Sequence, residues 1–348
     1  MKSIKLLLNQ KWAKKFFTQK VPHYFPKKKL INLQIKPLKI YLNYKSIVVK
    51  YCLELLGEGK NICKKNIIGK AERIDSKSLK SREKNGIWID YSTTKFLEKQ
   101  GLKDLITKPF DYLPSFNLYL NEFLPGYFLQ ELSMSNKDKE FLNKIPAVAE
   151  AIKKIHRVEV GEKDKIIRRD RRWEERAWER DLKIVQQYQP LIFDKVLFWV
   201  KECRFLRDKY RKYFNSNFYR MTHGDFYSRN IIISRGRIKL IDFSDGAFYD
   251  PLNDIADFLI NTELMFEYDF HNNYRQLIER VKNIFFKNYF SQPIEKEQEF
   301  KINYFILTNL IRIIAFAAMS EGNKKLASQS AIVIDKLMKF GEEKYNNL

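Results

Sequence analysis

The pattern of apolar and polar residues changes partway along the chain. Residues 39–56 alternate β-branched, aromatic and polar side chains, and residues 66–73 and 118–124 repeat this alternation in shorter runs, which predicts strands. Residues 88–99 have the pattern of a helix, closed by Gly101. Together these elements predict a small, strand-rich lobe over residues 36–125.

Beyond Gly126 the pattern is mostly helical. Apolar residues recur at steps of three and four between positions 145 and 155, which predicts an amphipathic helix with Pro146 in its first turn. Residues 219–243 interrupt this block with two short predicted strands, and two long helices follow, separated near Gly322. We therefore expect an α+β fold of two lobes, with the helical lobe over residues 126–348.

The first 35 residues are basic and irregular. We expect residues 1–35 to form an N-terminal extension, either a peripheral helix or an arm. The apolar run at its start is too short for a signal peptide. Residues 304–319 form the most apolar stretch, but they contain Asn309 and Arg312 and fall short of about 20 apolar residues. We expect a buried helix there, and no transmembrane segment.

Composition leaves the nature of the partner open. The chain carries 65 Lys and Arg against 42 Asp and Glu, a net charge of +23. Such an excess indicates an anionic partner, such as nucleic acid, lipid headgroups or a phosphorylated substrate. It is also what A/T-rich codons produce, and the scatter of the charges favours this second interpretation.

Cysteine and histidine usage argues against a zinc site. Cys52, Cys63 and Cys203 show no C-x-x-C spacing, and the four histidines are dispersed. An odd, sparse set of cysteines is typical of a reducing compartment, so we expect a cytoplasmic protein.

One polar loop carries the strongest chemical signal. Asp225 and Asn230 lie on a tight loop immediately before an apolar strand, and Asp242 ends the next strand. A hairpin of this length returns the chain on itself, so we expect these oxygens to converge at one end. A carboxylate and an amide oxygen suit Mg²⁺, and a carboxylate left free of metal can deprotonate a hydroxyl. These are the main requirements of phosphoryl transfer.

This loop resembles the catalytic loop of the aminoglycoside phosphotransferase/choline kinase-like family, in the protein kinase-like superfamily. The family loop reads H-G-D-x-x-x-x-N, as do His223 to Asn230 here. Protein kinases instead have H-R-D-L-x-x-x-N and D-F-G. Here Gly224 replaces the arginine of that loop, Ser244 replaces the glycine of D-F-G, and no A-P-E motif follows. The resemblance therefore favours small-molecule kinases.

The resemblance also implies a role for each residue of the motif. Asp225 would be the base that accepts the hydroxyl proton, and Asn230 and Asp242 would bind Mg²⁺. His223 would be structural. Asp254 lies in a segment that resembles the D-P-x-x-D-x-A helix of this family, and it would support the catalytic loop from beneath.

Upstream positions that would bind ATP are also implied by the resemblance. Lys70 resembles the strand lysine that contacts the α- and β-phosphates. Its carboxylate partner is open among Asp90, Glu83 and Glu98, and the spacing favours Asp90.

Residues 121–126 resemble the hinge between the lobes, where backbone groups of Glu122 and Leu124 would meet adenine. A G-x-G-x-x-G phosphate loop is absent.

The sequence thus predicts an ATP- and Mg²⁺-dependent kinase that phosphorylates a hydroxyl of a small molecule, with the basic charge favouring neutral or anionic acceptors. An alternative is a pseudokinase-like module whose basic surface contacts nucleic acid or a membrane periphery. A metal-dependent hydrolase is less consistent with so few histidines. The basic run at residues 168–172 is either a phosphate-binding patch or a solvated helix face paired with Glu174, Glu175 and Glu179, and the spacing favours the second.

Overall fold

The chain forms a mixed α+β fold made of two units. The computed structural model describes residues 4–41, 46–73, 85–135, 137–164, 166–268, 273–321, 327–346 and 348. Met1–Tyr127 and Ile232–Gly246 make up the first unit, and Phe128–Ile231 and Ala247–Leu348 make up the second.

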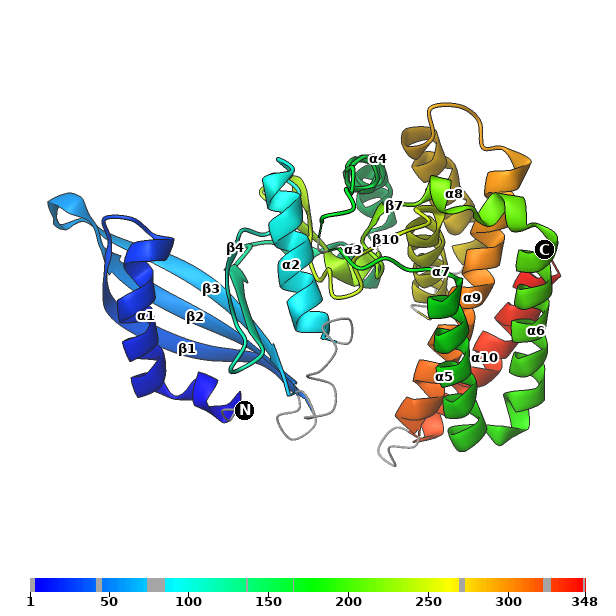
Figure 1. Ribbon diagram of the computed structural model, residues 1–348, viewed down its shortest axis with the longest axis horizontal. Helices are drawn as coiled ribbons and strands as arrows, with labels where there is room; N and C mark the ends of the chain where they lie inside the picture. Colours follow the sequence, from blue (N-terminus) through cyan, green and yellow to red (C-terminus); the bar gives the residue numbers. More distant parts are fainter. Residues whose placement is uncertain are drawn as a thin grey trace. The chain divides into compact units, whose positions relative to one another are not determined.

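The first unit is built on a five-stranded antiparallel sheet (Figure 1). The strand order is β1-β2-β3-β5-β4. The strands are β1 (Lys29–Tyr41), β2 (Ser46–Leu56), β3 (Ile62–Glu72), β4 (Pro109–Leu113) and β5 (Leu118–Glu122). The unit also contains helices α1 (Gln10–Tyr24) and α2 (Gly86–Lys99), and the 3-10 turns η1 (Ile4–Leu8) and η3 (Glu58–Lys60).

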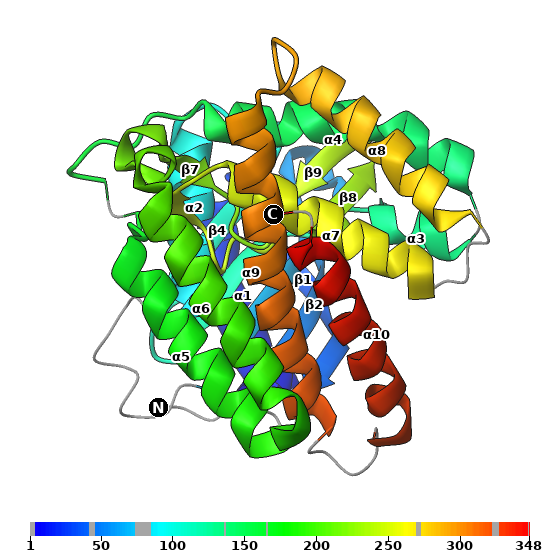
Figure 2. The same ribbon diagram turned by 90° about the vertical axis from the view of Figure 1, so that its right-hand side faces the viewer.

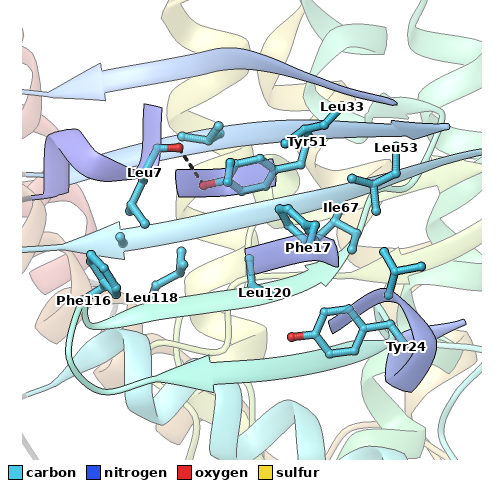
Figure 3. Close-up of a cluster of buried hydrophobic side chains, with 14 of the residues drawn as sticks. Leu7, Phe17, Tyr24, Leu33, Tyr51, Leu53, Ile67, Phe116, Leu118 and Leu120 are labelled. Carbon is cyan, nitrogen blue, oxygen red and sulfur yellow. Dashed lines mark hydrogen bonds between the residues drawn. The ribbon is translucent and has the colours of Figure 1, made fainter. Parts of the chain in front are cut away.

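Helix α1 covers one face of this sheet, and the apolar side chains between the helix and the sheet form the core of the first unit (Figure 3). Alternate residues of β2 are buried from Ile47 to Leu55, as expected for a strand with one covered face. They form one cluster with Phe17 and Val21 of α1, and the Tyr51 hydroxyl donates to the Leu7 carbonyl at 3.0 Å. Of the two forms expected for residues 1–35, a peripheral helix or an arm, the structure has a helix, and its buried side chains belong to the core of the first unit. Its apolar residues recur at helical spacing, and they pack into the core of the first unit.

The hairpin after the catalytic loop also differs from its predicted place. Strands β8 (Ile231–Ser234) and β9 (Arg237–Leu240) are joined by Arg235 and Gly236, both with positive φ, as in a type I′ turn. We placed the hairpin in the helical lobe, but residues 232–246 belong to the first unit. The physical reason is hydrogen bonding, because Leu240 N–H donates to Leu105 O at 2.7 Å and Ser234 Oγ donates to Pro125 O at 2.7 Å. A short strand, β6 (Tyr127–Phe128), completes the order β6-β8-β9.

The second unit is mainly helical (Figure 2). Its two strands, β7 (Arg220–Thr222) and β10 (Ala247–Tyr249), pair antiparallel. Its helices are α3 (Leu129–Met134), α4 (Asp138–His156), α5 (Arg171–Tyr188), α6 (Phe193–Lys209), α7 (Leu252–Tyr268), α8 (Tyr274–Tyr289), α9 (Lys296–Glu321) and α10 (Ala327–Tyr345). Four 3-10 turns connect them: η6 (Pro190–Ile192), η7 (Arg211–Phe214), η8 (Ser216–Phe218) and η9 (Ser228–Asn230).

Helix α9 is the central helix of this unit. It packs against α5, α6, α7 and α10. Within the described residues it alone is long and apolar enough to cross a membrane, yet 61% of its apolar window is buried inside the protein. The expectation of a buried helix at residues 304–319 agrees with this packing.

Helix α4 begins earlier than its pattern predicted. Asp138 starts the helix and Pro146 lies inside it, not in the first turn. Phe141 and Leu142 are buried and extend the apolar face one turn upstream. Burial of that extra turn stabilises the helix although proline removes one backbone donor.

Helix α5 pairs Arg171, Glu174 and Glu175 with side chains of helix α6. Glu175 pairs with Arg204 of α6 at 2.7 Å, and Arg171 pairs with Asp208 at 2.5 Å. Glu174 is buried, where it pairs with Arg207 and accepts the Tyr249 hydroxyl. The predicted pairing within a solvated face is therefore wrong, because Glu174 points into the core of the unit.

Candidate active site

In the first unit, three residues far apart in sequence converge on one ammonium group. Lys70 near the end of β3 places its Nζ 3.2 Å from Asp90 Oδ2 of α2 and 2.5 Å from Asp242 Oδ1, after β9. Of the other candidate partners, Glu98 pairs with Lys95 at 2.6 Å, and Glu83 lies outside the described residues. Within the described residues, Asp90 is the carboxylate of α2 that holds Lys70.

Burial and charge oppose each other at this cluster. Burial lowers the pKa of Lys70, but the carboxylates of Asp90 and Asp242 outweigh it and raise that pKa above its usual value. Burial raises the pKa of Asp90, while the Lys70 charge and the Phe243 amide, which donates to Asp90 Oδ1 at 2.9 Å, work against the rise. The ammonium therefore stays charged through the physiological range.

The two carboxylates differ in exposure. The Asp90 side chain is 4% exposed and the Asp242 side chain 33% exposed. Asp90 is fixed from two sides, by Lys70 and by the Phe243 amide. Asp242 is open to solvent on one side, so it can contact a second cation.

Asp242 also has unusual backbone geometry. Its φ is +63°, in the left-handed region that non-glycine residues seldom adopt. Such a conformation costs on the order of 1–3 kcal/mol, and it persists where the surroundings impose it. The next residue, Phe243, is fully buried and donates to Asp90. Strain at a solvent-accessible carboxylate is typical of a functional position.

A cavity of about 330 Å³ opens beside Lys70 within the first unit. Its lining includes Glu72, Ile87, Ser244 and Asp245. The Lys70 ammonium and several polar side chains therefore line a space that is large enough for a small ligand.

The predicted hinge residues lie at the end of β5. Glu122 uses its own N–H within the unit, donating to Lys108 O at 2.9 Å. The Leu124 N–H donates to no other described residue. Leu124 thus retains a backbone donor at the position where the resemblance places adenine.

In the second unit, the catalytic loop follows β7. Asp225 is half-buried, and Asn230 is 6% exposed. The Asn230 Nδ2 group donates to Asp225 Oδ2 at 3.0 Å and to the Asp225 carbonyl at 2.8 Å. Phe226 between them is fully buried and packs against Phe258 of α7. The loop therefore has one anchored apolar residue and one oriented carboxylate.

Asp254 holds the backbone of this loop from α7. It is fully buried, and it accepts His223 N–H at 2.7 Å and Gly224 N–H at 2.8 Å. Burial alone would raise the pKa of Asp254, but the hydrogen bond and charge of His156, followed by His223, bring it below its ordinary value. The supporting position that the resemblance gave Asp254 corresponds to these two backbone bonds.

His156 is a residue that sequence reasoning missed. It ends α4, and its Nε2 lies 2.9 Å from Asp254 Oδ2, while its Nδ1 lies 2.6 Å from the Tyr289 hydroxyl. Its place one residue after Ile155, on the apolar face of an amphipathic helix, was the available signal that it is buried. His223 of the loop is also fully buried, so one histidine from the loop and one from α4 lie in the interior of this unit.

The chemistry of these residues suits a magnesium ion. Asn230 uses its amide nitrogen on Asp225, and no described residue donates to its Oδ1, which leaves the oxygen that Mg²⁺ takes. Asp242, in the first unit, has a carboxylate, which is also a ligand that Mg²⁺ takes. No group of three His, Cys, Asp or Glu suited to a metal occurs in the described part of the chain.

The structure thus brings the predicted residues together in two sets. Lys70, Asp90 and Asp242 form one set within the first unit, and Asp225 and Asn230 form another within the second, supported by Asp254. Asn230 and Asp242, the two predicted magnesium ligands, belong to different units.

Comparison with known proteins identifies the family of the chain. The model of the phosphotransferase enzyme family (APH) matches residues 106–281, just over half of the chain. No curated protein sequence matches the chain.

Several solved structures share the fold at low sequence identity. An amicoumacin kinase, hAmiN, in complex with AMP-PNP, Ca²⁺ and Ami is 17% identical, with a TM-score of 0.64 over 97% of this chain and 93% of that chain. Choline kinase LicA from Streptococcus pneumoniae is 15% identical, with a TM-score of 0.56 over 94% and 99%. A choline kinase from Cryptosporidium parvum Iowa II is 12% identical, with a TM-score of 0.64 over 98% and 96%. The fold is therefore the protein kinase-like fold, and the chain belongs to the phosphotransferase enzyme family.

Proposed function

We propose that the protein is an ATP-dependent phosphotransferase that transfers the γ-phosphate to a hydroxyl group of a small molecule. The observation that carries the proposal is the catalytic loop. Asp225 is solvent-accessible and oriented by Asn230, and Asp254 fixes the backbone on which it sits. A fixed carboxylate within reach of solvent is what a base for an incoming hydroxyl requires.

Each remaining residue has a role in this proposal. Asn230 and Asp242 hold Mg²⁺, which when bound neutralises charge on the transferred phosphate. Lys70, kept charged by Asp90, pairs with the phosphates of ATP. The backbone of Glu122 and Leu124 contacts adenine. One similar structure contains AMP-PNP and Ca²⁺, which supports a nucleotide with a divalent metal as the donor. We place the reaction in the cytoplasm, where the three free cysteines stay reduced.

The test is ADP release from ATP with a panel of hydroxyl compounds, run in parallel with GTP and with and without Mg²⁺. Asp225→Asn keeps the size of the side chain and removes the base, so kcat is expected to fall by about 10²–10⁴-fold. The matched control is Asp194→Asn, an exposed aspartate of α6 outside both sets. Full activity of Asp225→Asn, with the control unchanged, would refute the role of Asp225.

A second function is favoured by the distribution of charge. Residues 1–127 and 232–246, the first unit, hold 29 Lys and Arg against 12 Asp and Glu, so +17 of the net +23 belongs to this unit. Lys11, Lys14 and Lys15 are exposed on α1. We propose that this unit also contacts an anionic membrane surface.

Sedimentation with vesicles tests this contact. Binding is expected to vesicles that contain anionic lipid and not to neutral ones, and to weaken between 0.05 and 0.5 M salt, as screening requires. Exchanging the three α1 lysines for glutamate is expected to abolish it. Equal binding to neutral vesicles would rule the proposal out, and binding only to nucleic acid would favour the other anionic partner.

A further inference from the structure

A second cavity lies within the helical unit, away from the residues described above as the catalytic loop. Its volume is about 400 Å³, which lies in the range of small-molecule sites. The ends of α4 and α8 and the starts of α7 and α9 contribute to its walls. Phe218 and Phe290 give it apolar surface, and Arg157 and Arg220 give it positive charge.

Two arginines in the wall of this cavity have guanidinium nitrogens that are available to bind a ligand. Lys301 and Asp250 are both nearly buried and pair at 2.6 Å, so they neutralise each other. The guanidinium group of Arg157 makes no hydrogen bond or ion pair with any described residue, although its backbone N–H donates to Lys153 O at 3.1 Å. Arg220 uses Nη1 on the carbonyls of Asn217 and Tyr219, which leaves its other nitrogens.

The remaining charged groups of the lining nearly balance. Lys153 reaches the Asn288 carbonyl at 3.3 Å and Glu150 at 3.8 Å. Glu295 and Glu297 lie at the mouth, at and just before the start of α9. With the buried pair set aside, Lys153 and the two arginines exceed the two glutamates by one positive charge.

Tyr289, at the end of α8, lies in the wall of the cavity together with both arginines. Burial raises the pKa of Tyr289, as do the carboxylates of Asp254 and Asp250, while Arg220 and Arg157 act against the rise. Arg157, Arg220 and Tyr289 all line this one cavity, and the phenol oxygen is 2.6 Å from His156 Nδ1.

From this oxygen a chain of hydrogen bonds leads to the catalytic loop. His156 Nε2 lies 2.9 Å from Asp254, and Asp254 accepts the backbone N–H of Gly224, the residue before Asp225, at 2.8 Å. His156 and Asp254 are almost fully buried. A group that fixes the Tyr289 hydroxyl therefore also fixes the imidazole and the carboxylate that hold the loop.

We propose that this cavity binds a small organic anion, with a phosphate or carboxylate group on Arg157 and Arg220 and an apolar body against Phe218 and Phe290. Paired guanidinium groups suit such oxygens, because they offer several donors in a fixed plane. When both ring nitrogens of His156 donate, to Asp254 and to the Tyr289 oxygen, the single hydroxyl proton of Tyr289 is available to the anion. Binding of the anion then reduces the motion of the catalytic loop through His156 and Asp254.

Two measurements test binding and coupling without using phosphotransfer, so they stand even if the proposed function fails. The first is calorimetric titration with phenyl phosphate, benzoate and neutral benzyl alcohol. The second is hydrogen exchange in the peptide that contains residues 222–228, with and without phenyl phosphate. Wild type is expected to bind at least one of the anions, to bind benzyl alcohol at least tenfold more weakly, and to exchange more slowly in this peptide when phenyl phosphate is bound.

Variants separate the two parts of the proposal. Arg157→Gln with Arg220→Gln is expected to weaken anion binding at least tenfold, and Arg211→Gln, an exposed arginine of η7 outside the cavity, leaves it unchanged. Tyr289→Phe keeps the ring and is expected to keep binding within about threefold, but to lose the slower exchange. Equal binding to the double variant would overturn the site. Slower exchange that persists in Tyr289→Phe would overturn the coupling.

Discussion

Replacing Asp254 with asparagine tests the support of the catalytic loop. The buried carboxylate contacts three donors, at 2.7, 2.8 and 2.9 Å. Asparagine keeps one acceptor oxygen and places an NH₂ group where the other stood, so at least one buried N–H of the loop loses its partner. A hydrogen bond to a charged group contributes about 1.5–3 kcal/mol, and an unsatisfied buried donor costs about 1–3 kcal/mol. We expect Asp254→Asn to lower the free energy of unfolding of the helical unit by about 3–5 kcal/mol.

The assay combines urea unfolding with hydrogen exchange of the loop and with kcat. Faster exchange at residues 222–228 is expected, together with a lower kcat, because Gly224 adjoins Asp225. Asp257→Asn is the matched control. Asp257 is equally buried one turn along α7, where it pairs with Arg312 at 2.9 Å and accepts from Asn261 Nδ2 at 3.1 Å. Both variants lose stability, and only Asp254→Asn changes the loop. Unchanged loop exchange and kcat in Asp254→Asn would refute the reasoning.

The difference in the free energy of unfolding between wild type and Asp254→Asn is expected to depend on pH, in a direction that follows from the pKa of Asp254. The native pKa of Asp254 lies below its ordinary value of 3.8, so the carboxylate stabilises the fold fully above about pH 4 and loses this contribution as the pH falls through the native pKa. The gap between wild type and Asp254→Asn is therefore expected to be constant from pH 7 to pH 5 and to narrow below pH 4. A gap that narrows between pH 7 and pH 5 would mean that burial, and not His156, dominates.

Two further variants test the other parts of the structure. Lys70→Met removes the charge between Asp90 and Asp242, so kcat/KM for ATP is expected to fall about 10²-fold or more in ADP-release assays, while Lys95→Met, on the other face of α2, leaves it unchanged. Gly341→Ala places a methyl group against the Trp199 ring, and this overlap is expected to lower the melting temperature. The overlap has to outweigh the higher helix propensity of alanine, which by itself would stabilise α10 by about 1 kcal/mol. An unchanged melting temperature would show that α10 can move away from α6 at little cost.

The chemistry of the site was predictable because much of it is contiguous in sequence. Asp225, Asn230 and Asp242 lie within eighteen residues on one loop and hairpin. Together with the H-G-D motif and the segment around Asp254 they indicate the family, which the family model confirms. The assignment of roles stays a prediction. The α+β class was also predictable, since strand and helix periodicities occupy different parts of the chain, and each strand of the large sheet pairs with a neighbour that is close in sequence, except where β3 pairs with β5.

The support of the site was not predictable, because it depends on contacts between distant segments. His156 and Asp254 are 98 residues apart, and His156 and Tyr289 are 133 residues apart. No local pattern marks such a pair. The same limit explains why residues 1–35 were taken for an extension. A basic composition describes the exposed face of α1, whereas Phe17 and Val21 on its other face decide where it packs.

The distribution of charge, by contrast, can be counted in the sequence, but the net charge of the whole chain conceals the difference between the two units. A bias toward A/T-rich codons should act on both units alike. Lys and Arg do occur at similar densities, 29 among the residues of the first unit and 36 in the larger second unit, but Asp and Glu number 12 against 30. The asymmetry is a depletion of acidic residues, which codon bias toward lysine does not produce. Selection against negative charge on the first unit does explain it, and a surface that must approach phosphate groups would impose that selection. If restoring acids at exposed neutral positions such as Thr18 and Gln19 on α1 left anionic-vesicle binding unchanged, this explanation would fail.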